Sequence, residues 1–255
     1  MADFPGYRIT VTEERVDRWI GQFRRADHDL AARVLDSVDF ITGEQITAAF
    51  RSILKSIPGW NVEEDQRDGR WRFVPFSSSS GESGDAMMHK FRLANGLTSK
   101  KHKDLFIWKS DLLRADLGPE DTVVFVDDFS GSGTQACDAW PETEELLPGK
   151  PKIYLALVAA TVTARDRIQR ETEIVVIPHQ TIAETENIFS PYCDCFSDAE
   201  KNDILRYCRR SDRTNPKGFG DCGLVLVFAH NCPNNSIPIL HKSTQNWEGL
   251  FRRYD

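Results

Sequence analysis

The sequence predicts an α/β protein with a largely parallel sheet, helices on both faces of that sheet, and a helical amino-terminal extension. From residue 71 onward, short apolar runs alternate with segments of helical periodicity. The runs are apolar throughout, which is typical of strands buried on both faces. The first sixty residues instead place apolar side chains at helical spacing. We therefore predict a helical subdomain at residues 1–62 and an α/β domain at 63–255.

The amino-terminal extension contains two clear helix starts. Thr12 precedes a helical apolar pattern and can accept a hydrogen bond from the first turn. Thr42 and Gln45 have the spacing of a capping box, and Pro58-Gly59 ends the helix that follows. No pattern here indicates chemistry, so we interpret this region as a lid or docking subdomain.

The predicted α/β domain alternates strands with helices. The strands are expected at 71–76, 122–126, 152–160, 173–177 and 224–229, and the helices at 87–93, 133–140, 163–170 and 198–209. In parallel sheets ligands bind at the carboxyl ends of the strands. Functional residues are therefore expected where a strand ends.

Composition limits the class of protein. The chain has 32 Lys and Arg against 39 Asp and Glu, a formal charge of −7. This balance argues against non-specific nucleic-acid binding, because phosphate affinity comes largely from cationic side chains. No apolar stretch approaches the roughly 20 residues that cross a bilayer, and the first residues lack a signal-peptide pattern. We expect a cytoplasmic protein that binds no membrane and whose six cysteines are reduced.

The segment from Asp127 to Thr134 is the strongest candidate site. It follows the apolar run Val123–Val126 and reads Asp-Asp-Phe-Ser-Gly-Ser-Gly-Thr. Glycines let the backbone approach a ligand, and Gly131 is expected at positive φ. The helix start that follows offers unpaired N–H donors. The segment therefore predicts a nest for a phosphate monoester, formed by Ser130, Gly131, Ser132, Gly133 and Thr134.

Asp127 and Asp128 are the candidate catalytic residues. Carboxylates at this point can accept hydrogen bonds from sugar hydroxyls and can hold Mg²⁺ through its water shell. They can also stabilise positive charge that develops on a sugar. The glycine spacing differs from that of a nucleophile elbow, and the lysine of a Walker A motif is absent. A ribose phosphate is the predicted ligand.

This segment resembles the phosphoribosyl diphosphate (PRPP) motif of type I phosphoribosyltransferases. In that motif four apolar residues precede two acidic residues, a variable pair and a Thr-Gly-x-Thr sequence. Asp127 and Asp128 match the acidic pair, which in the family contacts the ribose hydroxyls, and Ser132-Gly133 matches the start of the phosphate loop. Gln135 replaces the last Thr, so Thr134 is expected to substitute. The resemblance implies a type I phosphoribosyltransferase-like fold that binds PRPP or a nucleotide.

A serine-rich loop extends the resemblance. In the family, the first core strand leads into a loop that holds the diphosphate. Here the strand at 71–76 leads into Ser77, Ser78, Ser79, Ser80 and Gly81. These residues can supply hydroxyl and backbone donors, and they are predicted to form the diphosphate loop. The alternative is a linker, which their composition also favours.

The strand at 224–229 leads into a loop that contains His230, Asn231 and Asn234. These side chains can read a base or another acceptor by hydrogen bonds, or their amides can close turns beside prolines. This ending, together with the helical front and the Asp pair, is similar to phosphoribosyltransferase-like proteins of bacterial conflict and anti-phage systems. Some of those are thought to accompany retron reverse transcriptases as effectors. The resemblance implies a defence role, with a partner protein or nucleoprotein.

Two kinds of function remain open. The first is an enzyme acting at ribose C1′, either a phosphoribosyltransferase that uses PRPP or a nucleotide N-glycosidase in which water is the attacking group. Both need the Asp pair, the phosphate loop and Mg²⁺. The second is a catalytically silent module that senses a nucleotide or binds a partner in a defence complex. Turnover with Mg²⁺ and candidate nucleotides discriminates between them.

Overall fold

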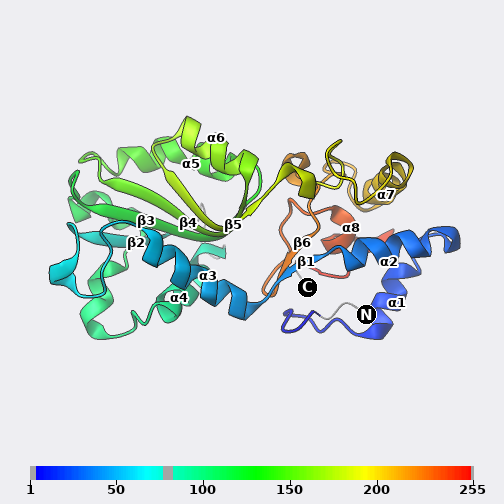
Figure 1. The fold of residues 1–255 in the computed structure, drawn as a ribbon, viewed down its shortest axis with the longest axis horizontal. Coiled ribbons are helices and arrows are strands. Elements are labelled where there is room, and N and C mark those ends of the chain that lie inside the picture. The colour runs from blue at the N-terminus through cyan, green and yellow to red at the C-terminus, as the bar shows by residue number, and fades with distance from the viewer. Residues whose placement is uncertain (1–3, 77–82, 254–255) are drawn as a thin grey trace. The chain divides into compact units, whose positions relative to one another are not determined.

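The computed structural model describes residues 4–76 and 83–253 (Figure 1). By its contacts the chain forms two compact units. The sheet unit comprises Ile46–Ile182, and the terminal unit combines Met1–Gln45 with Ala183–Asp255. The sequence suggested a domain boundary between residues 62 and 63, and the division into two units does not coincide with it. The predicted domain boundary stays a prediction. The predicted diphosphate loop, Ser77–Gly81, lies outside the described residues.

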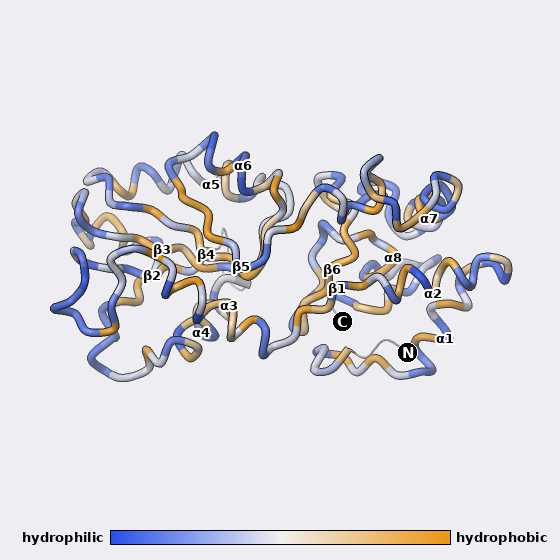
Figure 2. The backbone as a smooth tube through the Cα atoms, in the orientation of Figure 1, coloured by the Kyte–Doolittle hydropathy of each residue, from blue (hydrophilic) through white to orange (hydrophobic). Residues whose placement is uncertain are grey.

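The sheet unit contains a four-stranded parallel sheet in the order β2-β3-β4-β5. The strands are β2 (Trp71–Pro75), β3 (Thr122–Ser130), β4 (Lys152–Thr161) and β5 (Val175–Ile182). Hydrophobic residues predominate along β3 and β4 (Figure 2). The predicted α/β fold with a largely parallel sheet is confirmed, and β3 is an interior strand as expected.

Helices cover both faces of this sheet (Figure 1). On one face lie α5 (Thr134–Glu145) and α6 (Val162–Glu171), and on the other lie α3 (Gly43–Ser56) and α4 (Ser83–Ala94). Val123 and Phe125 of β3 pack with Trp140 of α5 and Ile168 of α6 in one buried cluster. On the opposite face Phe91 of α4 contacts rings of both α3 and β2. Because side chains alternate along a strand, odd-numbered residues of β3 face α5 and α6.

Two prolines lie inside secondary-structure elements. From the sequence, each of these elements was expected to end just before its proline. α5 continues through Pro141, which removes only one intrahelical hydrogen bond. Trp140 and Thr143 are buried on either side of it and hold the helix in place. β5 continues through Pro178, which is tolerated because β5 is at the edge of the described sheet and bonds only to β4.

The terminal unit combines helices with two small sheets. Its helices are α1 (Glu13–Ile20), α2 (His28–Asp36), α7 (Asp198–Ser211) and α8 (Pro238–His241). β1 (Asp39–Ile41) pairs in parallel with β6 (Leu226–Phe228), and β7 (Ser243–Thr244) pairs antiparallel with β8 (Trp247–Glu248). The expected strand at 224–229 is therefore shorter than predicted and pairs outside the main sheet. Its partner β1, with three residues, was too short to recognise by pattern.

Short 3₁₀ helices occur along both units. They are Arg25–Asp27, Glu64–Gln66, Lys100–Leu105, Lys109–Asp111, Leu113–Ala115, Glu184–Glu186 and Phe219–Asp221. Both predicted helix caps are confirmed: the Arg15 N–H donates to Thr12 Oγ1, and Thr42 and Gln45 form a reciprocal capping box. Among the described residues, no helix has the length and apolar character needed to cross a bilayer.

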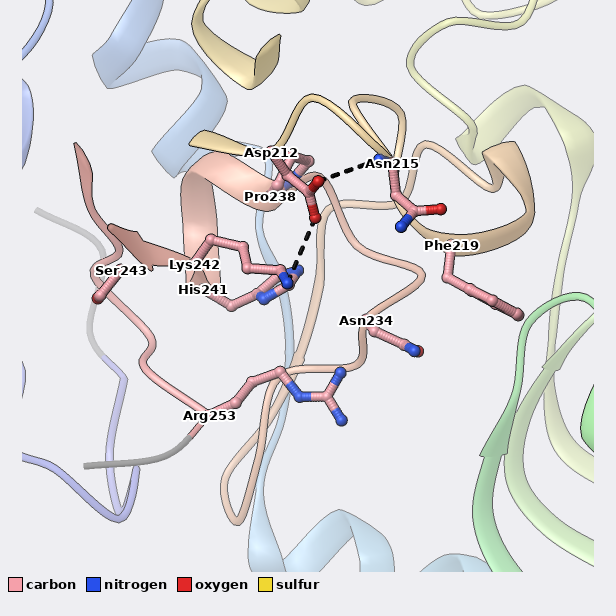
Figure 3. A pocket seen from close by; sticks show the side chains of 9 residues that line it. All are labelled: Asp212, Asn215, Phe219, Asn234, Pro238, His241, Lys242, Ser243 and Arg253. Atoms are coloured by element: carbon pink, nitrogen blue, oxygen red, sulfur yellow. Dashed lines mark hydrogen bonds and ion pairs between the residues drawn. The ribbon is translucent and has the colours of Figure 1, made fainter. Parts of the chain in front are cut away.

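A cavity opens in the terminal unit (Figure 3). Its walls come from the segment after α7, from Asn234, from α8 with the residues after it, and from Arg253.

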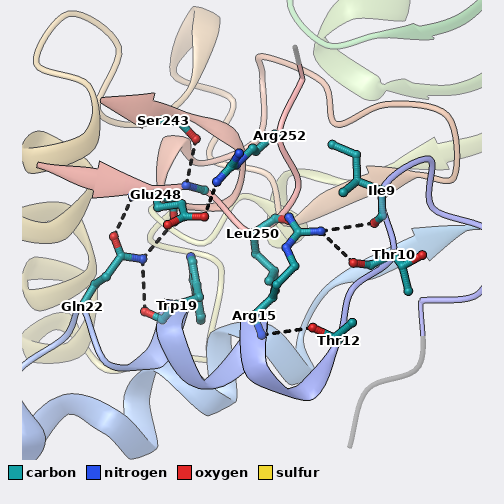
Figure 4. Close-up of polar contacts among 11 residues, drawn as sticks. Ile9, Thr10, Thr12, Arg15, Trp19, Gln22, Ser243, Glu248, Leu250 and Arg252 are labelled. Atoms are coloured by element: carbon teal, nitrogen blue, oxygen red, sulfur yellow. Dashed lines mark hydrogen bonds and ion pairs between the residues drawn. The ribbon is translucent and has the colours of Figure 1, made fainter. Parts of the chain in front are cut away.

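The two ends of the chain are joined within the terminal unit (Figure 4). The Arg15 guanidinium donates to the carbonyls of Thr10 at 2.8 Å and Leu250 at 2.7 Å. Gln22 and Glu248 exchange two hydrogen bonds, of 2.9 and 2.6 Å. The amino-terminal helices therefore share one fold with the carboxyl-terminal segment.

Candidate functional site

The acidic pair lies within strand β3. The sequence predicted a strand that ends at Val126, but β3 continues to Ser130, because β4 is long enough to pair with it as far as Ala160. Successive side chains of a strand point to opposite faces. Asp127 therefore lies on the face covered by α5 and α6, and Asp128 on the face covered by α4. The expectation that the strand ends before both carboxylates is wrong.

Asp127 is buried, with 4% of its surface exposed. Its Oδ1 accepts a hydrogen bond of 2.9 Å from the backbone N–H of Asp128. This bond fixes the carboxylate at the carboxyl end of an interior strand, where ligands of parallel sheets bind.

Asp128 is half-buried and has a cation near it. Burial lowers the pKa of the Lys90 ammonium on α4, and the charge of Asp128 acts in the opposite direction. The structure therefore associates Lys90 with the acidic pair.

Three residues, Gly131-Ser132-Gly133, connect β3 to α5. Gly133 has a φ of 73° and directly precedes the helix. A Cβ on it would lie 3.1 Å from the Ala164 carbonyl oxygen of α6, so only glycine fits without strain. Gly131 is not among the glycines at positive φ, so the expected left-handed position was assigned two residues too early.

Thr161 holds this loop against the next helix. Its Oγ1 donates to the Gly131 carbonyl at 2.6 Å and accepts from the Ala164 N–H at 2.9 Å. The same hydroxyl therefore caps α6 and fixes the loop. Such anchoring keeps the start of α5, with its unpaired N–H groups, in a constant position.

Arg167 lies beside the loop and was missed in the sequence. Its Nη1 donates to Thr134 Oγ1 at 2.9 Å and to the Ser132 carbonyl at 3.3 Å. Ser132 Oγ also donates to Thr134 Oγ1, at 3.0 Å. The topology of the fold could have indicated this residue. Helices that follow adjacent parallel strands begin at the same edge of a sheet, so a cation in the first turns of α6 can reach the loop before α5.

Other predicted residues lie elsewhere. His230, Asn231 and Asn234 belong to the terminal unit, whereas the Asp127–Thr134 segment belongs to the sheet unit. The His230 ring is 5.5 Å from that of Phe228, and the Asn234 carbonyl accepts from the Phe219 N–H at 2.8 Å. Asn234 also lines the cavity of that unit.

A parallel sheet with an acidic strand end, a glycine loop and a helix start defines a phosphoribosyltransferase-like α/β protein. The family model PRTase-CE matches residues 16–253, and the chain belongs to that family. No curated protein sequence matches the chain.

Proposed function

We propose that the segment from Asp127 to Thr134 binds the ribose 5-phosphate part of PRPP or of a nucleotide, and that the protein acts at ribose C1′. One observation carries the proposal. The buried carboxylate of Asp127 follows the apolar part of the interior strand β3. It lies on the same face of the sheet as the start of α5.

The phosphate would bind at the start of α5. Gly133 and Thr134 begin this helix, where backbone N–H groups lack intrahelical acceptors. Ser132 and Arg167 both donate to Thr134 Oγ1. A hydroxyl has two lone pairs and one hydrogen, so Thr134 retains its hydrogen for a phosphate oxygen. Ser130 and the Gly131 backbone complete the proposed phosphate site, and the Arg167 charge favours an anion.

Asp127 is the main proposed catalytic residue. It would accept a hydrogen bond from a ribose hydroxyl and stabilise the positive charge that develops at C1′. Asp128 keeps its proposed role as second acid, with a smaller contribution because its side chain leaves the strand on the other face.

Mg²⁺ is the proposed cofactor. Carboxylates are the oxygen ligands it prefers, and it usually keeps several waters while binding substrate phosphates. No group of three His, Cys, Asp or Glu gathers within residues 4–76 and 83–253. Asp127 and Asp128 would hold the ion through its water shell, together with the substrate's own diphosphate. When bound, it would neutralise the charge of that diphosphate.

The reaction would break one bond at C1′ and form another. With PRPP, the bond to the diphosphate oxygen breaks, the diphosphate leaves with its electron pair, and an acceptor atom bonds to C1′. With a nucleotide, the bond to the base nitrogen breaks and the base leaves with its electron pair. Water supplies the new oxygen at C1′ and gives up a proton, and the base takes up a proton. Ser77–Gly81 remain the proposed diphosphate loop. The contacts to a base or acceptor predicted at His230, Asn231 and Asn234 belong to the other unit, and that role stays a prediction.

A turnover assay tests this proposal. The protein is incubated with Mg²⁺ and either PRPP with candidate acceptor bases or each nucleoside monophosphate, and diphosphate and free base are measured by chromatography. An Asp127→Asn protein is the control, because it removes charge while preserving size. Product formation that depends on Asp127 supports the enzyme.

A second candidate is a catalytically silent nucleotide sensor or partner-binding module. It is favoured by Gln135, which replaces the final Thr of the resembling motif, and by the separation of the two carboxylates onto opposite faces of β3. Saturable binding without product would support it.

A role in anti-phage defence, alone or beside a retron, is proposed from the resemblance described above. Cells that express the protein with its neighbouring genes are challenged with phage, with the Asp127→Asn protein as comparison. Equal phage titres with and without the protein would contradict this role.

A further inference from the structure

The cavity in the terminal unit is large enough for a small organic ligand. Its volume is about 460 Å³, within the range of ligand pockets. Several chain segments meet around it, so it depends on the tertiary fold rather than on one loop (Figure 3). The described residues that line it are Asp212, Asn215, Phe219, Asn234, Pro238, His241, Lys242, Ser243 and Arg253.

The charged side chains of this cavity favour an anion. Burial alone would raise the pKa of Asp212, but backbone N–H groups of Asn215 and Thr214 and the charge of Lys242 hold that pKa below its usual range. Asp212 is thus a carboxylate and pairs with Lys242 at 3.3 Å. Arg253 adds a second cation, and in Figure 3 its guanidinium points toward Asn234 and the middle of the group. The described residues that line the cavity thus include two cations and one carboxylate.

His241 adds no charge to this balance. Burial lowers its pKa to about 3, so the ring is neutral near pH 7. Its Nε2–H donates to the Ser236 carbonyl at 3.2 Å, which fixes the ring as part of the cavity wall.

Phe219 presents an aromatic ring to this cavity from a fixed backbone. The ring is 39% exposed, although its backbone N–H donates to the Asn234 carbonyl at 2.8 Å and its carbonyl accepts from Asn235 Nδ2 at 2.9 Å. Gly218 and Gly220 on either side have φ of 79° and 66°. A Cβ on Gly218 would lie 2.3 Å from the Asn235 carbonyl oxygen. Such a preorganised, exposed ring is suited to stacking on a planar ligand.

Two asparagine side chains at this cavity are available for a ligand. Asn187 and Asn235 donate to carbonyls of the 3₁₀ helix Phe219–Asp221, at 3.1 and 2.9 Å. Asn215 and Asn234 differ, because within the described part of the chain their side-chain amides make no hydrogen bond. An amide offers both donors and an acceptor, which matches the edge of a nucleobase.

We propose that this cavity binds a nucleoside monophosphate, whose base stacks on Phe219 and hydrogen-bonds to Asn215 and Asn234, and whose phosphate faces Arg253 and Lys242. The site is separate from the proposed ribose-phosphate site and does not depend on it.

Isothermal titration tests this proposal on the full-length protein. AMP, GMP, CMP and UMP are titrated separately in the presence of EDTA and of excess PRPP, which would compete for the proposed phosphate nest at Ser130–Thr134. Inorganic phosphate and the corresponding nucleosides are titrated as partial ligands. We expect saturable binding of at least one monophosphate, with affinity at least about tenfold above that of either partial ligand.

Variants locate the binding event. Phe219→Ala and Arg253→Met should each weaken binding about tenfold or more, since each removes a proposed direct contact. Tyr192→Ala, at an aromatic side chain of the same unit that is 67% exposed and does not line the cavity, is the matched control. Circular dichroism and thermal unfolding verify that each variant is folded.

Two outcomes would overturn the proposal. One is the absence of monophosphate binding by the folded wild-type protein at millimolar ligand. The other is binding that Phe219→Ala and Arg253→Met leave unchanged. Binding that persists in excess PRPP, beside a failed turnover assay, would support this site while contradicting the proposed enzyme, so the two failures are distinguishable.

Discussion

The two units differ in how the chain builds them. The sheet unit is one continuous stretch, Ile46–Ile182, whose strands follow one another along the chain. The terminal unit joins the first 45 residues to those after Ile182. Trp19 and Trp247, from opposite ends of the sequence, both donate their indole N–H to the Ile239 carbonyl, at 2.8 and 2.9 Å. Continuity along the chain therefore says little about which residues share a core.

The two units also differ in what their sites require of the chain. The candidate phosphate site in the sheet unit is formed largely by consecutive residues, which a motif can represent. The cavity of the terminal unit combines residues as distant as Asp212 and Arg253. A motif search finds the first kind of site and not the second.

The largest expected effect concerns Trp19, which is 1% exposed in the terminal unit. Replacing it by alanine should destabilise that unit by about 3–5 kcal/mol, because a large cavity forms and the indole hydrogen bond is lost. Hydrogen exchange measured by mass spectrometry should show increased exchange in both α1 and the residues around Trp247, while β3 and β4 stay protected. Trp108→Ala, at a 60% exposed position, is the control. Equal deprotection of β3 and β4 would show that the two units unfold as one.

The second prediction compares the carboxylates of β3. Asp127→Asn should lower turnover by about 100-fold or more, as expected for loss of a preorganised group worth about 2.7–4 kcal/mol. Asp128→Asn should have a smaller effect, because its side chain points to the face of Lys90. Single-turnover rates at saturating substrate measure both. Equal losses would mean that the two carboxylates act together despite their alternation.

Acid should destabilise the terminal unit through His241. Burial, and then the charge of Arg253, lowers its folded-state pKa to about 3. The unfolded chain, with an ordinary His pKa of about 6.5, therefore binds the proton first as pH falls. The stabilisation is complete above about pH 6.5, and about 2 kcal/mol is lost between pH 7 and pH 5.

Urea unfolding monitored at tryptophan across this pH range measures the loss. His241→Gln should flatten the dependence relative to wild type. An unchanged slope in His241→Gln would assign the acid sensitivity to another group.

The smallest predicted effect concerns the loop glycine. Gly133→Ala should cost about 1–2 kcal/mol, because a side chain at positive φ is strained and its Cβ would crowd the Ala164 carbonyl. Gly118→Ala is the matched control, since a Cβ there meets nothing within 4 Å and its φ is not positive. Equal midpoints of thermal unfolding for the two variants would contradict the assignment.

The sequence predicted the features of the fold that depend on local periodicity. It did not predict the features that depend on residues distant along the chain. The apolar run of β3 and the caps at Thr12 and Thr42 were readable because each depends on a few adjacent residues. The extension of β3 to Ser130 depends on the length of β4, and the short strand β1 exists because β6 pairs with it. Arg167 was unreadable because only the tertiary fold brings it to Thr134.

The joined termini have a consequence for synthesis on the ribosome. Trp19 emerges early, but its hydrogen-bond acceptor Ile239 follows 220 residues later. At about 5–20 residues per second, the apolar faces of α1 and α2 wait roughly 10–45 s for the segment that covers them. The continuous sheet unit can complete itself within that interval. Until the segment around Ile239 has been synthesised, the nascent chain should therefore expose the apolar faces of α1 and α2, a binding site for chaperones.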